Sequence, residues 1–238
     1  MARLHRSGER RSRGETLLEG PHLVKEAVAT GVPLRVMFAL SDDADAAGWA
    51  ALSGVELVVV SRAVLDRLSS TQSPQSPVAV MMIPHRPLSS DRSVLVPWEI
   101  SDPGNLGTII RAAAAFGFDA GIGPGCADPW SPKALRSGAG GHFRTGVASI
   151  ELEGITTVAA VVSGGVPPEA MPPGRLAILI GGEARGLPEE VSTAADVRVT
   201  IPMTAGSESL NAAMAAAILA YVLAQRSRKY GGLEAGGR

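Results

Sequence analysis

The first part of the chain alternates between helical and extended hydrophobic patterns. Apolar residues from Leu17 to Val28 follow helical spacing, and Gly20-Pro21 marks a helix start within that run. Continuous apolar runs at residues 34–40, 55–60 and 78–83 predict strands, and residues 63–68 predict a short helix. Because helices and strands alternate, we expect a small, layered α/β unit with a partly parallel sheet.

The second part repeats this alternation over a longer stretch. Strands are predicted near residues 94–96, 120–122, 158–162, 176–180 and 196–201, and helices at residues 106–116, 132–137, 188–194 and 210–225. A polar, proline-containing segment between the two parts is typical of a linker. We therefore expect a smaller domain at residues 15–84, a linker at 85–92, a larger α/β domain at 93–226 and a flexible tail at 227–238.

The first 14 residues are rich in arginine. Arg3, Arg6, Arg10, Arg11 and Arg13 stand against a single acidic residue, Glu9. One interpretation is a disordered, solvated tail. Another is an arm that binds the phosphates of a nucleic acid, and the two interpretations are compatible. We expect residues 1–14 to form a basic, flexible arm.

Charge and composition exclude several classes of protein. The 238 residues carry a net charge of −1, so any binding of a polyanion depends on local patches. The single cysteine, Cys126, cannot form an internal disulfide, and His142 has no second ligand at metal spacing, so we expect no metal. The N-terminus has no apolar run behind its arginines, and residues 210–224 are too short to span a bilayer. We expect a cytoplasmic protein without a membrane partner.

Three glycine-punctuated blocks stand out in the second part. They are Asp102-Pro-Gly-Asn-Leu-Gly-Thr-Ile-Ile-Arg111, Ile180-Gly-Gly-Glu-Ala-Arg-Gly-Leu187 and Ile201-Pro-Met-Thr-Ala-Gly-Ser-Glu-Ser-Leu-Asn211. In the first block, Asn105 can cap the helix that follows. In the third, Ser207 or Ser209 can cap the last helix. Taken singly, each block is typical of an ordinary helix cap or turn. Arg185 alone would be interpreted as an ordinary surface residue.

Together and in this order, the blocks resemble the signature motifs of the SPOUT class of RNA methyltransferases, in its SpoU/TrmH-type ribose 2′-O branch. This resemblance covers about residues 93–225. Over residues 15–83, the order of elements is similar to the ribosomal-protein-like domain that binds substrate in many such enzymes. The resemblance implies an α/β fold with a trefoil knot in the catalytic domain, and a homodimer whose active sites draw on both subunits.

The resemblance also implies an activity and a site. The activity is transfer of a methyl group from S-adenosyl-L-methionine to a ribose 2′-hydroxyl of RNA, with ribosomal RNA favoured over transfer RNA and no metal required. The implied catalytic residues are Arg111, Asn105, Glu183, Ser209 and Asn211. The implied cofactor-binding residues are Gly181, Gly182, Gly186, Leu187, Ile201, Met203 and Leu210.

The chemical role of Arg111 has two interpretations. A ribose 2′-hydroxyl is a very weak acid, so its methylation benefits from a base, and the family proposal gives that role to the arginine. Arginine, however, stays protonated in proteins. We favour Arg111 as a cation that grips a phosphate or stabilises the developing alkoxide during a direct, in-line transfer.

A basic loop follows the first block. Residues 136–140 resemble the family pattern Arg-x-Ser-x-Gly, except that Gly138 stands where serine is common. We expect Lys133, Arg136 and Arg144, with His142 nearby, to bind RNA phosphates. The alternative is a solvated basic loop.

Three rival functions stay open. Methylation of a base is disfavoured by the combination of Asn105, Arg111 and Ser209-Leu-Asn211, which favours ribose. A non-catalytic RNA-binding protein would have little need to retain these residues. A nucleotide-binding oxidoreductase is disfavoured because no helix opens at the third glycine of Gly121-Ile-Gly-Pro-Gly125.

Overall fold

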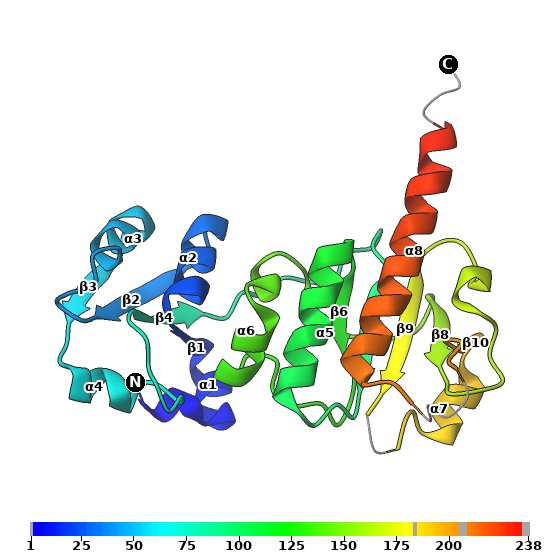
Figure 1. Cartoon of the computed structure of the whole chain (residues 1–238), viewed down its shortest axis with the longest axis horizontal. Helices are drawn as coiled ribbons and strands as arrows, with labels where there is room; N and C mark the ends of the chain where they lie inside the picture. Colours follow the sequence, from blue (N-terminus) through cyan, green and yellow to red (C-terminus); the bar gives the residue numbers. More distant parts are fainter. Residues whose placement is uncertain (1, 183–184, 205–208, 235–238) are drawn as a thin grey trace.

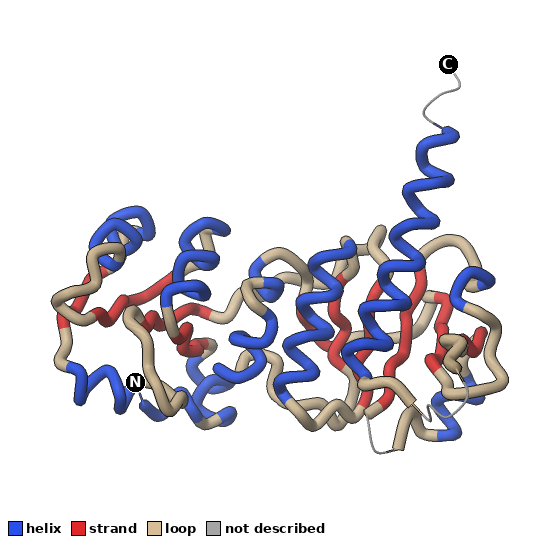
Figure 2. The backbone as a smooth tube through the Cα atoms, viewed as in Figure 1, coloured by secondary structure: helices blue, strands red, loops and turns tan. Residues whose placement is uncertain are grey.

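The computed structural model describes residues 2–182, 185–204 and 209–234. It forms two α/β domains that lie side by side in an elongated molecule (Figures 1 and 2). The smaller domain comes first in the chain, and no helix or strand lies in the connection between Met82 and Val94. Within the described residues, no helix is long and apolar enough to cross a membrane.

The smaller domain is built on a four-stranded sheet with strand order β1-β4-β2-β3. Strands β2 and β3 are parallel, whereas β4 runs antiparallel to both β1 and β2, as the predicted partly parallel sheet requires. The elements are η1 (Ala2–His5), α1 (Ser7–Arg13), β1 (Glu15–Glu19), α2 (Pro21–Thr30), β2 (Leu34–Ala39), α3 (Ala46–Ser53), β3 (Glu56–Val59), α4 (Arg62–Leu68) and β4 (Val78–Met82).

The residues around Leu17 form a strand, which corrects the predicted helix. All five residues of β1 are buried, and the strand pairs with β4. A short, fully apolar run has no periodicity that separates a buried strand from a helix. Helix α2 begins only at Pro21, after Gly20 with its φ of 89°. Helix α3 was not predicted, because its residues are small and apolar with no distinct polar face.

The arginine-rich N-terminus is folded onto the molecule. Arg10 is only 3% exposed, and its guanidinium lies 2.5 Å from the carboxylate of Asp128 in the larger domain. Leu4 is buried in an apolar cluster with Leu17 and Leu65. The prediction of a flexible arm is therefore wrong for residues 2–14, because the ion pair of Arg10 holds α1 in place and the buried Leu4 holds η1.

The larger domain contains a six-stranded sheet with strand order β10-β8-β9-β5-β6-β7, in which every neighbouring pair is parallel. All five predicted strands are present, and the three-residue β7 was missed. The elements are β5 (Val94–Trp98), α5 (Pro103–Phe116), β6 (Asp119–Ile122), α6 (Pro132–Gly138), η2 (Gly141–Phe143), β7 (Val147–Ser149), β8 (Thr156–Ala160), η3 (Pro168–Ala170), β9 (Leu176–Gly181), α7 (Glu189–Ala194), β10 (Val197–Val199) and α8 (Ala212–Glu234).

Helices α5 and α8 pack together over one face of this sheet (Figure 1). Leu106, Ile109 and Ile110 of α5 and Leu219 of α8 are fully buried there. Burying each such side chain contributes roughly 1.5–3 kcal/mol. Helix α8 continues to Glu234, well beyond the end predicted at residue 225, so the predicted flexible tail is helical through residue 234.

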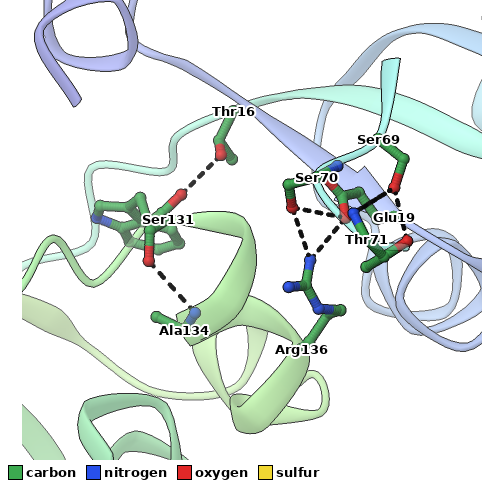
Figure 3. A network of polar contacts seen from close by, with 9 residues as sticks. Thr16, Glu19, Ser69, Ser70, Thr71, Ser131, Ala134 and Arg136 are labelled. Carbon is green, nitrogen blue, oxygen red and sulfur yellow. Dashed lines mark hydrogen bonds and ion pairs between the residues drawn. The ribbon is translucent and has the colours of Figure 1, made fainter. Parts of the chain in front are cut away.

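The two domains share apolar and polar contacts. Leu135 of α6 and Phe143 of η2 are buried within the apolar cluster of the smaller domain. Glu19 of β1 accepts a hydrogen bond from Arg136 Nη1 at 2.6 Å and one from the backbone N–H of Ser70 at 2.9 Å (Figure 3). The carboxylate of Glu19 thereby links the loop at Ser70, in its own domain, to Arg136 of α6, so the two domains pack against each other.

Candidate active site

A pocket lies where three neighbouring parallel strands end. Its walls come from the carboxyl ends of β8, β9 and β10 and from the segment that leads into α8. Parallel strands bring their carboxyl ends to one edge of a sheet, and ligands of such sheets bind outside that edge. The walls are mostly apolar, with bare backbone at Gly181, Gly182 and Gly186.

Gly181 is required by a close approach of two backbone segments. A Cβ at this position would lie 2.1 Å from both the carbonyl carbon of Gly186 and the nitrogen of Leu187. The turn is closed by a hydrogen bond of 2.8 Å from the N–H of Gly186 to the carbonyl oxygen of Gly182. The turn after β9 therefore folds tightly against its own strand and forms one wall of the pocket.

Six of the seven residues predicted to bind the cofactor line this pocket. They are Gly181, Gly182, Gly186, Ile201, Met203 and Leu210. Leu187 does not, because its side chain packs with Val94, Val96 and Leu179 in a separate apolar cluster. The sequence interpretation missed the wall formed by residues 160–162, because no local pattern shows that β8 lies beside β9.

A second pocket adjoins the first and shares Gly182 and Gly186 with it. Asn105 lines this second pocket, and its Oδ1 accepts a hydrogen bond of 3.2 Å from Asn211 Nδ2. Ser209 lines the first pocket. Residues that are 106 positions apart thus meet where the two pockets join. Glu183, also predicted for the site, lies outside the described residues.

Two further residues of the second pocket were not assigned to the site from the sequence. Glu99 has a φ of 55°, in the left-handed region that favours glycine, and Arg185 is exposed at the same pocket rather than on an unrelated surface. A non-glycine residue in this conformation stores backbone strain, and such strain clusters at functional sites. No residue pattern around Glu99 indicates its conformation.

The caps of the two helices at the site differ from those predicted. Asp102, not Asn105, caps α5, since its carboxylate accepts from the N–H of Asn105 at 2.9 Å. Lys133 donates to the same carboxylate at 2.5 Å, and these hydrogen bonds, that of Lys133 above all, lower the pKa of Asp102. Asn211 caps α8 in place of a serine, because its Oδ1 accepts from the N–H of Ala213 at 2.9 Å.

Arg111 does not join Asn105 and Asn211 within the chain. Six residues along a helix place Arg111 roughly 9 Å from Asn105 along the axis and on a different side. Its side chain is exposed and, among the described residues, makes no hydrogen bond or ion pair. Its backbone is covered by Gly141, where a Cβ would lie 2.9 Å from the Cα of Arg111. The guanidinium is therefore available to a second molecule.

The predicted phosphate patch is a set of ion pairs. Lys133 pairs with Asp102, Arg136 with Glu19 at 2.6 Å and Arg144 with Glu26 at 2.7 Å. The hydrogen bond from Arg144 lowers the pKa of Glu26. Arg136 and Arg144 bridge to the smaller domain, so the loop helps to hold the domains together, while the side chains of Lys133 and Arg144 stay more than half exposed.

His142 and Gly138 form a tightly packed pair in this loop. His142 is buried, and burial lowers its pKa to about 4, so the ring is neutral at neutral pH and binds no phosphate. Its Nε2 lies 2.9 Å from the carbonyl oxygen of Pro129. A Cβ at Gly138 would lie 2.4 Å from the ring, which explains glycine where the family pattern has serine. Among the described residues, no cluster of His, Cys, Asp and Glu could hold a metal.

Comparisons with known proteins agree with this arrangement. The model of the SpoU rRNA Methylase family matches residues 92–221, and that of the MRM3-like substrate binding domain matches residues 1–79. The chain is 33% identical, over 93% of both chains, to the 23S rRNA (guanosine(2553)-2′-O)-methyltransferase RlmP of Bacillus subtilis.

Two solved structures share the whole architecture. One is the SpoU methyltransferase AviRb from Streptomyces viridochromogenes in complex with AdoMet, with a TM-score of 0.81, 26% identity and coverage of 94% of this chain and 95% of that one. The other is the AdoMet-bound rRNA methyltransferase from Sinorhizobium meliloti, with a TM-score of 0.81, 25% identity and coverage of 94% and 92%. The chain belongs to the SpoU rRNA methylase family.

Proposed function

We propose that the protein transfers a methyl group from S-adenosyl-L-methionine to a ribose 2′-hydroxyl of ribosomal RNA. The observation that carries this proposal is the junction of the two pockets, where a glycine-walled cavity meets the hydrogen-bonded pair Asn105 and Asn211. Ribosomal RNA is favoured over transfer RNA because the relative that matches 93% of the chain is named for 23S rRNA. We place this activity in the cytoplasm.

The first pocket suits an adenosine-containing cofactor. The apolar side chains of Ile201, Met203 and Leu210 offer surfaces for a flat base, and Gly181 and Gly182 leave backbone groups that no Cβ covers. S-adenosyl-L-methionine supplies an electrophilic methyl group on a sulfonium. Asn105, Asn211 and Ser209 then orient the ribose beside that pocket, which is a contribution of positioning.

Arg111 provides the positive charge in this proposal. Because arginine stays protonated, it stabilises the 2′-oxygen as negative charge develops or holds the adjacent phosphate. We propose that it acts in the site of a second copy in a homodimer. Helices α5 and α8 support this arrangement, since Arg111 lies exposed on α5 while Met214 and Tyr221 of α8 are 55% and 51% exposed.

A trefoil knot completes the proposed catalytic domain. Its support is the first pocket, whose lining comes both from the turn after β9 and from the segment that leads into α8. In the proposed topology the C-terminal segment threads through a loop before α8 begins. The loop and the threaded segment would then close around the cofactor.

The substitution Arg111→Ala tests the catalytic assignment. We expect methyl transfer to ribosomal RNA to fall by roughly 10²–10³-fold, as when one stabilising donor is removed from a catalytic site. The affinity for S-adenosyl-L-methionine, measured by calorimetry, should not change. Mapping of alkali-resistant 2′-O-methyl sites in the RNA would identify the methylated nucleotide. A variant that methylates at the parental rate contradicts the assignment.

Mixing two inactive variants tests the shared site. If Arg111 serves the partner's pocket, mixed dimers of Arg111→Ala and Asn211→Ala contain one complete site, and part of the activity returns. If each subunit uses its own Arg111, every site in the mixture is damaged and no activity returns. A parental protein that binds RNA but neither binds S-adenosyl-L-methionine nor methylates would favour a non-catalytic RNA-binding protein.

A further inference from the structure

A groove at the junction of the two domains lies apart from both pockets of the proposed active site. It is lined by Arg10 and Arg11 of α1, by the connection at residues 83–87, by Trp130 and by β7. Strand β7 is the edge of the six-stranded sheet that adjoins the smaller domain, whereas the cofactor pocket uses β8, β9 and β10. Helix α1 lies beside α6 at this junction (Figure 1).

The groove gathers basic side chains in a protein with a net charge of −1. Arg10, Arg11, His85 and Arg86 line it, and none of its described lining residues is Asp or Glu. The guanidinium of Arg10 already has partners within the protein, because it pairs with Asp128 and donates to the carbonyl oxygen of Leu4. Its role is to hold α1 against the larger domain, which places the neighbouring Arg11 at the groove.

Two arginines of the groove are available to a ligand. Arg11 is exposed and, in the described part of the chain, its side chain makes no hydrogen bond or ion pair. Arg86 is also exposed, and its Nη1 donates a long hydrogen bond of 3.3 Å to the carbonyl oxygen of Phe143. This differs from the loop cations Arg136 and Arg144, which are neutralised by carboxylates.

Trp130 adds a rigid aromatic surface. Its ring lies 5.4 Å from the buried ring of His142, and its backbone N–H donates to Asp128 at 2.9 Å. The same Asp128 binds Arg10, so one carboxylate positions both the helix and the tryptophan. Exposed cations beside a fixed aromatic ring are the combination with which proteins bind single-stranded nucleic acid, through phosphates and stacked bases.

We propose that this groove binds a single-stranded segment of RNA that flanks the methylated nucleotide. Arg11 and Arg86 bind its phosphates, and Trp130 stacks on an unpaired base. Strand β7 lies three strand spacings from β9, roughly 14 Å, which a few nucleotides span. This proposal rests on the proposed function, because the RNA in the groove is the substrate that enters the active site.

The double variant Arg11→Ala/Arg86→Ala tests the groove. Its binding to a fluorescein-labelled single-stranded RNA of mixed sequence is followed by anisotropy over a series of KCl concentrations. We expect affinity to fall by roughly five- to tenfold per arginine, and the slope of log K against log salt to become shallower by about 0.7 per arginine. The variant Arg11→Lys/Arg86→Lys should restore most of both, since lysine also binds phosphate as a point charge.

A matched control separates local contacts from net charge. Arg67→Ala/Arg198→Ala removes two exposed arginines of α4 and β10, outside the groove. We expect its affinity and salt slope to match those of the parental protein. Trp130→Leu should weaken binding by about fivefold or more without changing the salt slope, because stacking is not ionic. Thermal unfolding checks that each variant is folded.

The outcomes distinguish this proposal from the proposed function. If the parental protein binds S-adenosyl-L-methionine and methylates RNA, but the groove variant keeps its RNA affinity and salt slope, only the groove proposal fails. If the groove variant and the Arg67/Arg198 control lose RNA affinity equally, the groove proposal is also overturned. It is overturned as well if a peptide strand binds on β7 and RNA binding does not change. If the parental protein neither binds the cofactor nor methylates RNA, the proposed function itself fails.

Discussion

At the scale of single residues, one glycine decides how the candidate site packs and another decides how the loop at the domain junction packs. Gly181 allows the turn at Gly186 to close against β9, and Gly138 makes room for the ring of His142. The second case explains why the chain departs from the serine of the family pattern. A hydroxyl is absent at residue 138, and a buried histidine fills the space that its Cβ would need.

Gly181→Ala should weaken cofactor binding without unfolding the protein. The added methyl group would lie 2.1 Å from backbone atoms of Gly186 and Leu187, so the turn must move away from the pocket. We expect the affinity for S-adenosyl-L-methionine, measured by calorimetry, to fall by at least about tenfold, since a displaced turn loses several backbone contacts at once.

Gly48→Ala is the matched control for this substitution. Gly48 lies within α3, and a Cβ there meets no atom within 4 Å. Alanine at an exposed helical position stabilises a helix by roughly 0.5–1 kcal/mol relative to glycine, so this variant should melt higher and bind normally. Normal cofactor affinity in Gly181→Ala would show that the turn is not part of the cofactor site.

At the scale of elements, the sequence predicts long patterns well and short or buried ones poorly. The apolar run of β9 and the helical spacing of α5 were predicted because each extends over several residues. Strand β1 was mistaken for helix, and β7 was missed, because five buried residues and three residues carry no usable period. That the side chain of Leu187 packs with the apolar cluster around Val94 could not be predicted, because a turn does not reveal which of its side chains points back to the core.

The meeting of Asn105 with Asn211 could be predicted only through the family resemblance. Asn105 lies in α5 and Asn211 is the cap of α8, and local patterns do not show that α5 packs against α8. For the same reason, the ion pairs of Arg136 and Arg144 were not foreseen, since their partners lie more than 100 positions away. Charge patterns indicate cations, whereas only the fold shows which of them are neutralised.

Substitutions of Asn211 separate its capping role from its role at the site. Asn211→Ala removes the acceptor for the N–H groups of Ala213 and Met214, and we expect the free energy of unfolding to fall by about 1 kcal/mol in urea titrations. Asn211→Ser retains a capping oxygen and should recover most of that stability. Both variants lose the amide that donates to Asn105, so both should lose methyl transfer. An active serine variant would limit Asn211 to a structural role.

At the scale of the whole molecule, the two domains depend on one junction. Leu135 and Phe143 extend the smaller domain's apolar cluster, and the carboxylates Glu19, Glu26 and Asp128 each bind an arginine across the boundary. His142 lies among these residues, with its ring beside Trp130. A change in the charge of His142 therefore acts on the contact that orients one domain against the other.

Acid should weaken the protein through the protonation of His142, at the contact between the two domains. Burial lowers the pKa of His142 from 6.5 to about 4, so the folded state favours the neutral ring. Its stabilising contribution is complete above pH 6.5 and is lost as pH falls toward 4, by roughly 3 kcal/mol in all. Urea titrations between pH 7 and 4.5 measure most of this loss, and the lowered pKa of Glu26 places its own effect below that window.

His142→Gln isolates this contribution, because an amide also donates to the carbonyl oxygen of Pro129 but does not titrate. We expect the variant to be less stable than the parental protein at pH 7, because its shape fits the space beside Gly138 less well. Its free energy of unfolding should nevertheless change little between pH 7 and 4.5. If both proteins lose stability in parallel over that range, groups other than His142 control the acid response of the domain junction.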